Sequence, residues 1–259
     1  MTDLILVQRD GPIATVVLNR PDKLNALTKP MWRRLGEVLE ELSADDDLRC
    51  VVLRGAGGKA FSPGNDISEF ETDRSNPEQA KAYGEVLHFT LGALKTCRHP
   101  TVALIEGICV GGGLEIAALC DLRICGESSR FGVPIKRLGL VMAYPEIEGL
   151  RRLVGRAATL EILLEGRVFG AAEAKDKGLV TRVVPDGEVE AEAYATAGRI
   201  AEGAPLVARW HKKFVDRLED PAPLGEAELD EGYACYATED FQIGYSSFLD
   251  KTKPAFKGR

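Results

Sequence analysis

The sequence predicts an α/β core followed by a largely helical C-terminal region. Short apolar or β-rich runs alternate with longer segments in which apolar residues have helical spacing, and Gly, Pro, Asn or Asp residues separate them. Beyond Asp186 strand signals become rare, and the chain is charged and interrupted by prolines. We therefore expect an α/β core over residues 1–190 and a helical region over residues 191–259.

The N-terminal elements have clear local signals. Residues 4–9 and 13–19 are β-rich runs separated by Asp-Gly-Pro, a turn sequence, so they predict a β-hairpin. Thr28 can cap a helix that has Pro30 in its first turn, because a threonine hydroxyl accepts a hydrogen bond from an early helix amide. Apolar residues then recur at helical spacing as far as Leu42.

The rest of the core repeats the order of strand and helix. We expect strands at 50–53, 101–105, 122–125 and 180–184, a loop at 55–58, and helices at 81–96, 113–120 and around 150–164. This order implies right-handed crossovers within one α/β core. The units differ in length, so they do not form a strict sequence repeat.

Composition excludes several classes of function. The net charge of −7 argues against a broad surface for nucleic acid or for an anionic membrane. Six cysteines form no CxxC pair and three histidines lack metal-ligand spacing, so we expect reduced thiols, no metal site and a cytoplasmic location. We expect neither a signal peptide nor a membrane span, because no uncharged apolar segment reaches about 18 residues.

One glycine-rich segment carries most of the chemical information. Within TVALIEGICVGGGLEIAALCDLRIC at 101–125, Gly111, Gly112 and Gly113 precede an apolar helix whose only charged residue up to position 120 is Glu115. The first turn of a helix leaves backbone N–H groups unpaired, and a buried carboxylate is costly. An acid/base group beside free amides suits chemistry next to a carbonyl, although Glu115 could instead satisfy the helix dipole.

A second loop, KAFSPGNDI at 59–67, follows the strand expected at 50–53. Gly64 permits a backbone turn that leaves the amide of Asn65 free to face a ligand. Amides from two separate loops would form an oxyanion hole. The alternative is that Asn65 is only a turn residue.

Six segments, spread over nearly the whole chain, carry a family resemblance: NRPDKLNAL at 19–27, AFSPGNDI at 60–67, GICVGGGLEIAALCDLRIC at 107–125, FGVPIKRLGL at 131–140, EGRVFGAAEAKDKGLVTRVVP at 165–185 and FLDKTKPAFKGR at 248–259. In this order they resemble the crotonase superfamily, the enoyl-CoA hydratase/isomerase family. The resemblance implies a crotonase-like spiral of ββα units with a helical C-terminal trimerisation region. It also implies a homotrimer or a dimer of trimers.

The resemblance implies an acyl-CoA thioester substrate, with coenzyme A entering as part of that substrate and no separate cofactor. Lys23 matches a position near the CoA phosphates. The region of Lys251 or Lys253 would bring a basic tail toward CoA, often from a neighbouring subunit.

The resemblance also assigns roles in the reaction. The amides of Asn65 and Gly112 would bind the thioester oxygen and stabilise an enolate. Glu115 matches one of the two catalytic glutamates of the hydratases. The other candidates for substrate binding are Ala60, Ser62, Gly64, Asp66, Ile67, Gly111, Ile135 and Tyr144.

The sequence departs from the hydratase pattern at one position. Pro134 is followed by Ile135, where hydratases have their second catalytic glutamate. Hydration needs water delivered to Cβ and a proton delivered to Cα, a task that two carboxylates can share. Either Glu115 does both, or Tyr144 or Glu146 substitutes, or the reaction differs.

Three hypotheses follow. The leading one is an enoyl-CoA hydratase that acts through an enolate, with Glu115 as general acid/base and help from Glu146. The second is a single-base reaction, either isomerisation of an enoyl-CoA or decarboxylation of an acyl-CoA. The third is a non-catalytic protein that binds acyl-CoA or RNA, although the acidic charge disfavours RNA.

Overall fold

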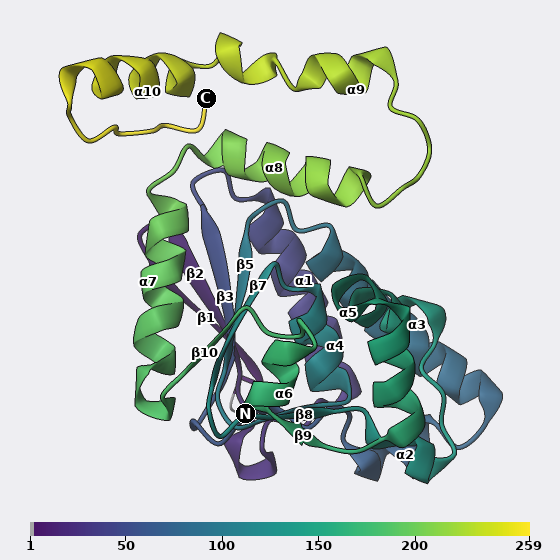
Figure 1. Ribbon diagram of the computed structural model, residues 1–259. Helices are drawn as coiled ribbons and strands as arrows, with labels where there is room; N and C mark the ends of the chain where they lie inside the picture. Colours follow the sequence, from purple (N-terminus) through teal and green to yellow (C-terminus); the bar gives the residue numbers. More distant parts are fainter. Residues whose placement is uncertain (1–2) are drawn as a thin grey trace.

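Two β-sheets organise the computed structural model, which describes residues 3–259 (Figure 1). The larger sheet contains, in spatial order, β1 (Ile5–Asp10), β2 (Ile13–Leu18), β3 (Cys50–Gly55), β5 (Thr101–Ile105), β7 (Leu122–Gly126) and β10 (Arg182–Val184). The smaller sheet contains β4 (Ala60–Ser62), β6 (Ile108–Val110), β8 (Arg130–Gly132) and β9 (Phe169–Gly170). β1 and β2 form the expected antiparallel hairpin, and the other neighbours in the larger sheet are parallel.

The chain winds as a spiral of ββα turns. The successive strand pairs β3–β4, β5–β6 and β7–β8 each place one strand in the larger sheet and one in the smaller sheet. The helices that follow these pairs are α2 (Phe70–Asp73) and α3 (Pro77–Lys95), then α4 (Gly112–Leu119), then α5 (Tyr144–Glu165). The spiral implied by the resemblance is therefore confirmed.

The expected strands of the larger sheet are all present, with small shifts at their ends. The smaller sheet was not predicted from the sequence. Its strands have two or three residues each, which is too short for a period-two pattern to be recognised. They exist because three parallel neighbours pair across the spiral, and this pairing is a tertiary effect.

Helix α1 (Lys29–Ala44) begins as predicted. The hydroxyl of Thr28 accepts a hydrogen bond from the Met31 amide, and Pro30 occupies the first turn. Its apolar face packs between the sheet and α3, and Trp32 is fully buried there. Figure 1 shows α1, α3, α4 and α5 on one side of the larger sheet, where they cover the main core.

The opposite side of the larger sheet is covered by α7 (Val189–Ala201) (Figure 1). Val189, Ala193 and Ala197 are buried against apolar residues of β3, β5 and β7. The boundary expected near residue 190 therefore falls inside a helix that packs on the core. The smaller helix α6 (Ala171–Asp176) joins β9 to the segment leading to β10.

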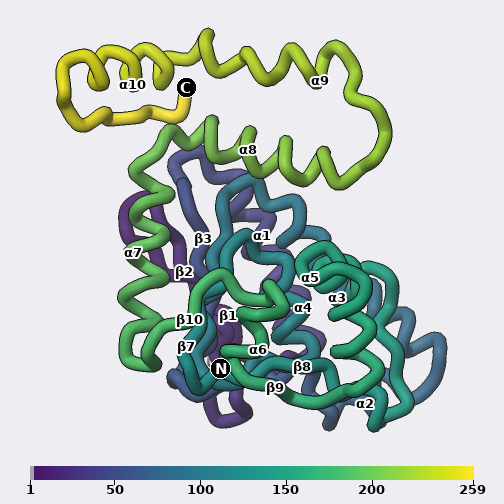
Figure 2. The backbone as a smooth tube through the Cα atoms, in the orientation of Figure 1, coloured from purple at the N-terminus to yellow at the C-terminus, as the bar shows by residue number. Residues whose placement is uncertain are grey.

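Three helices lie beyond the sheets, as expected for the C-terminal region. α8 (Pro205–Arg217) covers one end of the larger sheet, and α9 (Glu226–Glu231) and α10 (Glu239–Asp250) form a further layer above it (Figure 1). Figure 2 shows the last residues turning back along α10. The Asp240 carboxylate fixes this tail by accepting hydrogen bonds from the amides of Lys257 and Gly258. No helix within residues 3–259 is long and apolar enough to cross a membrane.

Candidate active site

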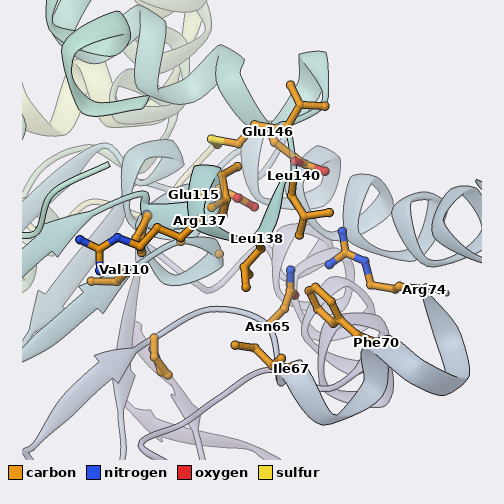
Figure 3. Close-up of a pocket in the computed structure, with 17 residues that line it drawn as sticks. Asn65, Ile67, Phe70, Arg74, Val110, Glu115, Arg137, Leu138, Leu140 and Glu146 are labelled. Carbon is orange, nitrogen blue, oxygen red and sulfur yellow. The ribbon is translucent and has the colours of Figure 1, made fainter. Parts of the chain in front are cut away.

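Three loops converge at one edge of the smaller sheet. β4, β6 and β8 are parallel neighbours, so their carboxyl ends lie at the same edge, where ligands commonly bind in parallel sheets. These strands lead into the loop at 63–66, into Gly111 and α4, and into the 3₁₀ helix Pro134–Leu138. Residues of all three loops line a cavity of about 290 Å³ (Figure 3).

The first loop leaves one backbone amide without an acceptor. The Gly64 amide donates to Ser62 Oγ at 3.0 Å, and the Asp66 amide donates to the Leu27 carbonyl at 2.8 Å. Between them, the Asn65 amide finds no acceptor within residues 3–259. Asn65 lines the cavity, so this donor is available to a ligand.

The second loop leaves another backbone amide without an acceptor. Gly111 has a left-handed φ of +53° and donates its amide to the Gly132 carbonyl at 2.9 Å. Gly112 begins α4, and its amide has no acceptor among the residues described, as expected in the first turn of a helix. A Cβ at Gly113 would lie 2.2 Å from the Ser62 carbonyl oxygen, so only glycine lets the helix approach the first loop.

The two loops are in backbone contact. Gly64 has φ +96°, and a Cβ at this position would lie 2.6 Å from the Gly112 nitrogen. A Cβ at Gly112 would lie 3.3 Å from the Gly64 Cα. The unpaired amides of Asn65 and Gly112 are therefore close neighbours on one cavity wall, an arrangement able to stabilise an oxyanion.

Trp32 and Asn25 hold the two loops in this arrangement. The sequence did not indicate either role. Trp32 donates its indole N–H to Asn65 Oδ1 at 2.6 Å, which fixes the orientation of the Asn65 side chain. The fully buried side-chain amide of Asn25 donates to the carbonyls of Ala56 and Ala60, and the main-chain carbonyl of Asn25 accepts from Ser62 Oγ. Asn25 lies in NRPDKLNAL, one of the segments that carried the resemblance, and this was the only available signal.

Glu115 lies in α4, three residues after Gly112, and is 7% exposed. Its Oε2 atom is buried without a hydrogen-bond partner among the described residues. Burial, followed by repulsion from Glu146, raises the pKa of Glu115 to about 8, although the charge of Arg74 opposes this shift. This carboxyl group therefore keeps its proton to a higher pH than an ordinary glutamate does, which suits a proton donor.

A second carboxylate enters the cavity from another helix. Glu146 lies in the first turn of α5, where Oε2 accepts a hydrogen bond from the Ala143 amide at 2.9 Å. Its Oε1 lies 3.3 Å from His88 Nε2, and its side chain is 13% exposed. Figure 3 shows the carboxyl groups of Glu115 and Glu146 on the same side of the cavity. Ile135 also lines the cavity, at the position where hydratases have a glutamate.

The structure brings seven of the residues predicted from the sequence together. The cavity wall includes Asn65, Ile67, Gly111, Gly112, Glu115, Ile135 and Glu146. It also includes two cationic residues that sequence reasoning did not select, Arg74 and Arg137. Arg74 lies in no distinguishing motif, and Arg137 lies in FGVPIKRLGL without a role that the sequence indicated. Only the convergence of three loops places them here.

Four other predicted residues support the loops without lining the cavity. Ala60 and Ser62 are buried in β4, and Gly64 contacts the glycine loop rather than the cavity. Asp66 forms an ion pair with Arg20 at 2.6 Å, which lowers the pKa of its carboxyl to about 2. All four lie outside the cavity wall.

The remaining candidates lie on the surface of this single chain. Tyr144 is 93% exposed at the start of α5 and is not part of the cavity wall. Lys23 is exposed at the end of the 3₁₀ helix Pro21–Lys23. Lys251 ends α10, and Lys253 pairs with Glu202 at 2.8 Å. Their proposed contacts with CoA stay predictions.

Comparison with known sequences relates the chain to one family of enzymes. The sequence profile of the enoyl-CoA hydratase/isomerase family matches residues 8–259. The chain is 35% identical over 260 residues to the probable enoyl-CoA hydratase of Mycobacterium tuberculosis, covering 99% of both proteins. It is 31% identical over 258 residues to the short-chain-enoyl-CoA hydratase of Clostridium acetobutylicum, covering 98% of both.

Solved structures agree. The crystal structure of an enoyl-CoA hydratase/carnithine racemase from Magnetospirillum magneticum has a TM-score of 0.98 at 54% sequence identity, covering 100% of this chain and 97% of that one. Fold and site thus define a crotonase-type α/β protein. The chain belongs to the enoyl-CoA hydratase/isomerase family.

The contact between the loops makes Gly64 intolerant of a side chain. Gly64→Ala should destabilise the protein by about 2 kcal/mol or more, because the methyl group meets the Gly112 amide and the backbone is left-handed. Urea denaturation measures this. Gly92→Ala is the control, since a Cβ there meets nothing within 4 Å in helix α3. Equal stabilities of the two variants would show that the loops do not touch.

Burial of Glu115 predicts a pH-dependent stability. The pKa of this carboxyl is higher in the folded than in the unfolded chain, so ionisation costs folded-state stability from about pH 4.5 to about pH 8. Glu115→Gln should therefore gain stability relative to wild type as pH rises through this window, by up to about 1.4 kcal/mol per pH unit. Denaturation at pH 4, 6 and 8 measures the difference, with exposed Glu127→Gln as control. A difference independent of pH would contradict the assignment.

Proposed function

We propose that this protein is an enoyl-CoA hydratase, adding water across the C=C bond of a 2-enoyl-CoA thioester. The observation that carries this proposal is the pair of unpartnered amides, at Asn65 and Gly112, on the same cavity as the buried Glu115. Relatives that carry hydratase names align over nearly the full length of the chain and support it.

The two amides stabilise the negative charge that develops during the reaction. The thioester oxygen accepts hydrogen bonds from Asn65 and Gly112. As the water oxygen bonds to Cβ, the C=C electrons move toward the thioester carbonyl and form an enolate. Donors fixed by the backbone need no reorganisation at this point, and loss of one such donor typically slows a reaction about a hundredfold to a thousandfold.

Two carboxyl groups then divide the proton transfers. Glu146 accepts a proton from the attacking water, while the protonated Glu115 donates a proton to Cα, so that one water is added in total. The raised pKa of Glu115 supports its role as the acid. The position of Glu146 in the cavity supports its substitution for the glutamate that Ile135 replaces. Proton exchange with solvent restores both groups.

Ile135 favours a second candidate function. With one base, Glu115 could move a proton between carbons of a 3-enoyl-CoA and produce the conjugated isomer without adding water. Decarboxylation at the same oxyanion hole is the related possibility. A non-catalytic acyl-CoA-binding protein would need neither the buried carboxyl group nor the repulsion from Glu146 that it tolerates.

Activity assays separate these candidates. With crotonyl-CoA, Glu115→Gln and Glu146→Gln should each lower kcat by about a hundredfold to ten-thousandfold, because each removes a proton-transfer group. Glu148→Gln is the control on the same helix, since Glu148 pairs with Lys95 outside the cavity. Product identification with crotonyl-CoA and a 3-enoyl-CoA side by side completes the test. An active Glu146→Gln enzyme, or isomerisation without hydration, would favour the single-base reaction.

We also propose that the C-terminal helices form the contacts of a homotrimer. A dimer of trimers would need further contact surfaces. Tyr245 and Phe248 lie three residues apart on α10 and are both exposed, Phe248 by 83%. Exposed aromatic residues on one helix face are typical of a surface that a partner covers.

Sedimentation measures this assembly. The wild-type protein should sediment as a trimer or hexamer, and the double variant Tyr245→Asp/Phe248→Asp as a monomer, because two charges would be buried at the contact. Leu164→Asp, on the exposed end of α5, is the matched control and should keep the wild-type assembly. A monomeric wild-type protein would refute the proposal.

A further inference from the structure

Arg74 places an unpaired positive charge on the wall of the catalytic cavity. It follows α2, and its guanidinium lies 4.8 Å from the ring centres of both Phe70 and Tyr83. Figure 3 shows the guanidinium directed toward the cavity, near Leu140. Contacts with two rings restrict the side chain to this direction.

No carboxylate within residues 3–259 lies within ion-pair distance of Arg74. The nearby acids have other partners. Asp73 pairs with Lys29 at 3.6 Å, and Glu69 accepts hydrogen bonds from the Tyr83 hydroxyl and the Lys29 amide. Arg74 is therefore a half-buried cation whose donors remain available to a ligand.

Much of the cavity wall is apolar. Ile67, Leu138, Leu140 and Met142 line the same cavity as Arg74. A cation held against such a surface gains little from it, whereas a planar guanidinium binds a carboxylate through two parallel hydrogen bonds. The chemistry that completes the site is therefore an anionic group on the ligand.

We propose that Arg74 binds a carboxylate at the far end of the acyl group, so that the substrate is the CoA thioester of a short dicarboxylic acid. This inference rests on the proposed function for the position of the thioester at Asn65 and Gly112. It assigns the anion to the acyl chain because Arg74 shares one cavity with these amides and with Glu115. Arg137, the other cation on the wall, is exposed and points away from the two glutamates (Figure 3).

The cavity repels a carboxylate at the end of the acyl group only weakly. Glu115 lines the same cavity, and burial raises its pKa and so disfavours its charged form. The guanidinium of Arg74 and the carboxyl group of Glu115 line the same cavity, so the positive charge of Arg74 opposes the rise in the pKa of Glu115. A carboxylate on the acyl chain would therefore be attracted by Arg74, which lines the same cavity as Glu115 and Glu146.

Binding of saturated thioesters tests the proposal without any reaction. Adipyl-CoA and hexanoyl-CoA have equal chain length and differ in a terminal carboxylate, and neither has a C=C bond. By calorimetry at pH 7, wild type should bind adipyl-CoA about tenfold or more tightly than hexanoyl-CoA, the scale expected for hydrogen bonds to a charged group. Equal affinities, or a preference for hexanoyl-CoA, would overturn the proposal.

Variants assign the preference to Arg74. Arg74→Met should abolish the preference for adipyl-CoA, and Lys81→Met, which removes an exposed cation from α3, should keep it. Free CoA is titrated in parallel. If Arg74→Met weakens free CoA as much as adipyl-CoA, Arg74 contacts the CoA part and the proposal is wrong.

Turnover separates this inference from the proposed function. Wild type should hydrate the CoA thioester of hex-2-enedioic acid with a kcat/KM about tenfold or more above that for hex-2-enoyl-CoA, and Arg74→Met should remove this ratio. A preference for adipyl-CoA in binding, without hydration of either enoyl thioester, would refute the hydratase while keeping the anionic acyl group. Hydration of both at equal kcat/KM would do the reverse.

Discussion

The site depends on the approach of two backbone loops to within van der Waals distance at Gly64 and Gly112. Any side chain at Gly64 would enter the space of the Gly112 amide, and any side chain at Gly113 would meet the Ser62 carbonyl. Glycine at these positions is therefore a condition of the architecture, not a consequence of flexibility. The contact leaves two amides unpaired side by side, and Asn25 and Trp32 secure the loops that carry them.

Burial of the Glu115 carboxyl group beside these loops lowers the stability of the folded protein. An unpartnered carboxyl oxygen in an apolar helix disfavours ionisation, so the group stays protonated where most carboxyl groups are charged. Glu146 differs because it accepts a hydrogen bond from the α5 N-terminus and lies beside His88. Two carboxyl groups in unlike environments are a common basis for dividing acid and base roles.

In the proposed mechanism, Glu146 takes the role of the glutamate that the hydratase pattern has at the position of Ile135. Glu146 reaches the cavity from the following helix, eleven residues later in the chain. Ile135 lines the cavity as an apolar residue, and Arg74 is a polar residue of the same wall that the proposed reaction does not use.

The sequence alone determined the α/β class, the hairpin, the Thr28 cap and the strands of the larger sheet. Through the family resemblance, it also predicted that Asn65, Gly112 and Glu115 belong to one site. The helices and strands follow from residue patterns that extend over five residues or more. The site residues follow from motifs that occur in a fixed order along the chain. Only the tertiary structure decided the smaller sheet, the support from Asn25 and Trp32, and the presence of Arg74 and Glu146 on one cavity. Each of these depends on contacts between segments far apart in the chain, whose energies no local pattern records.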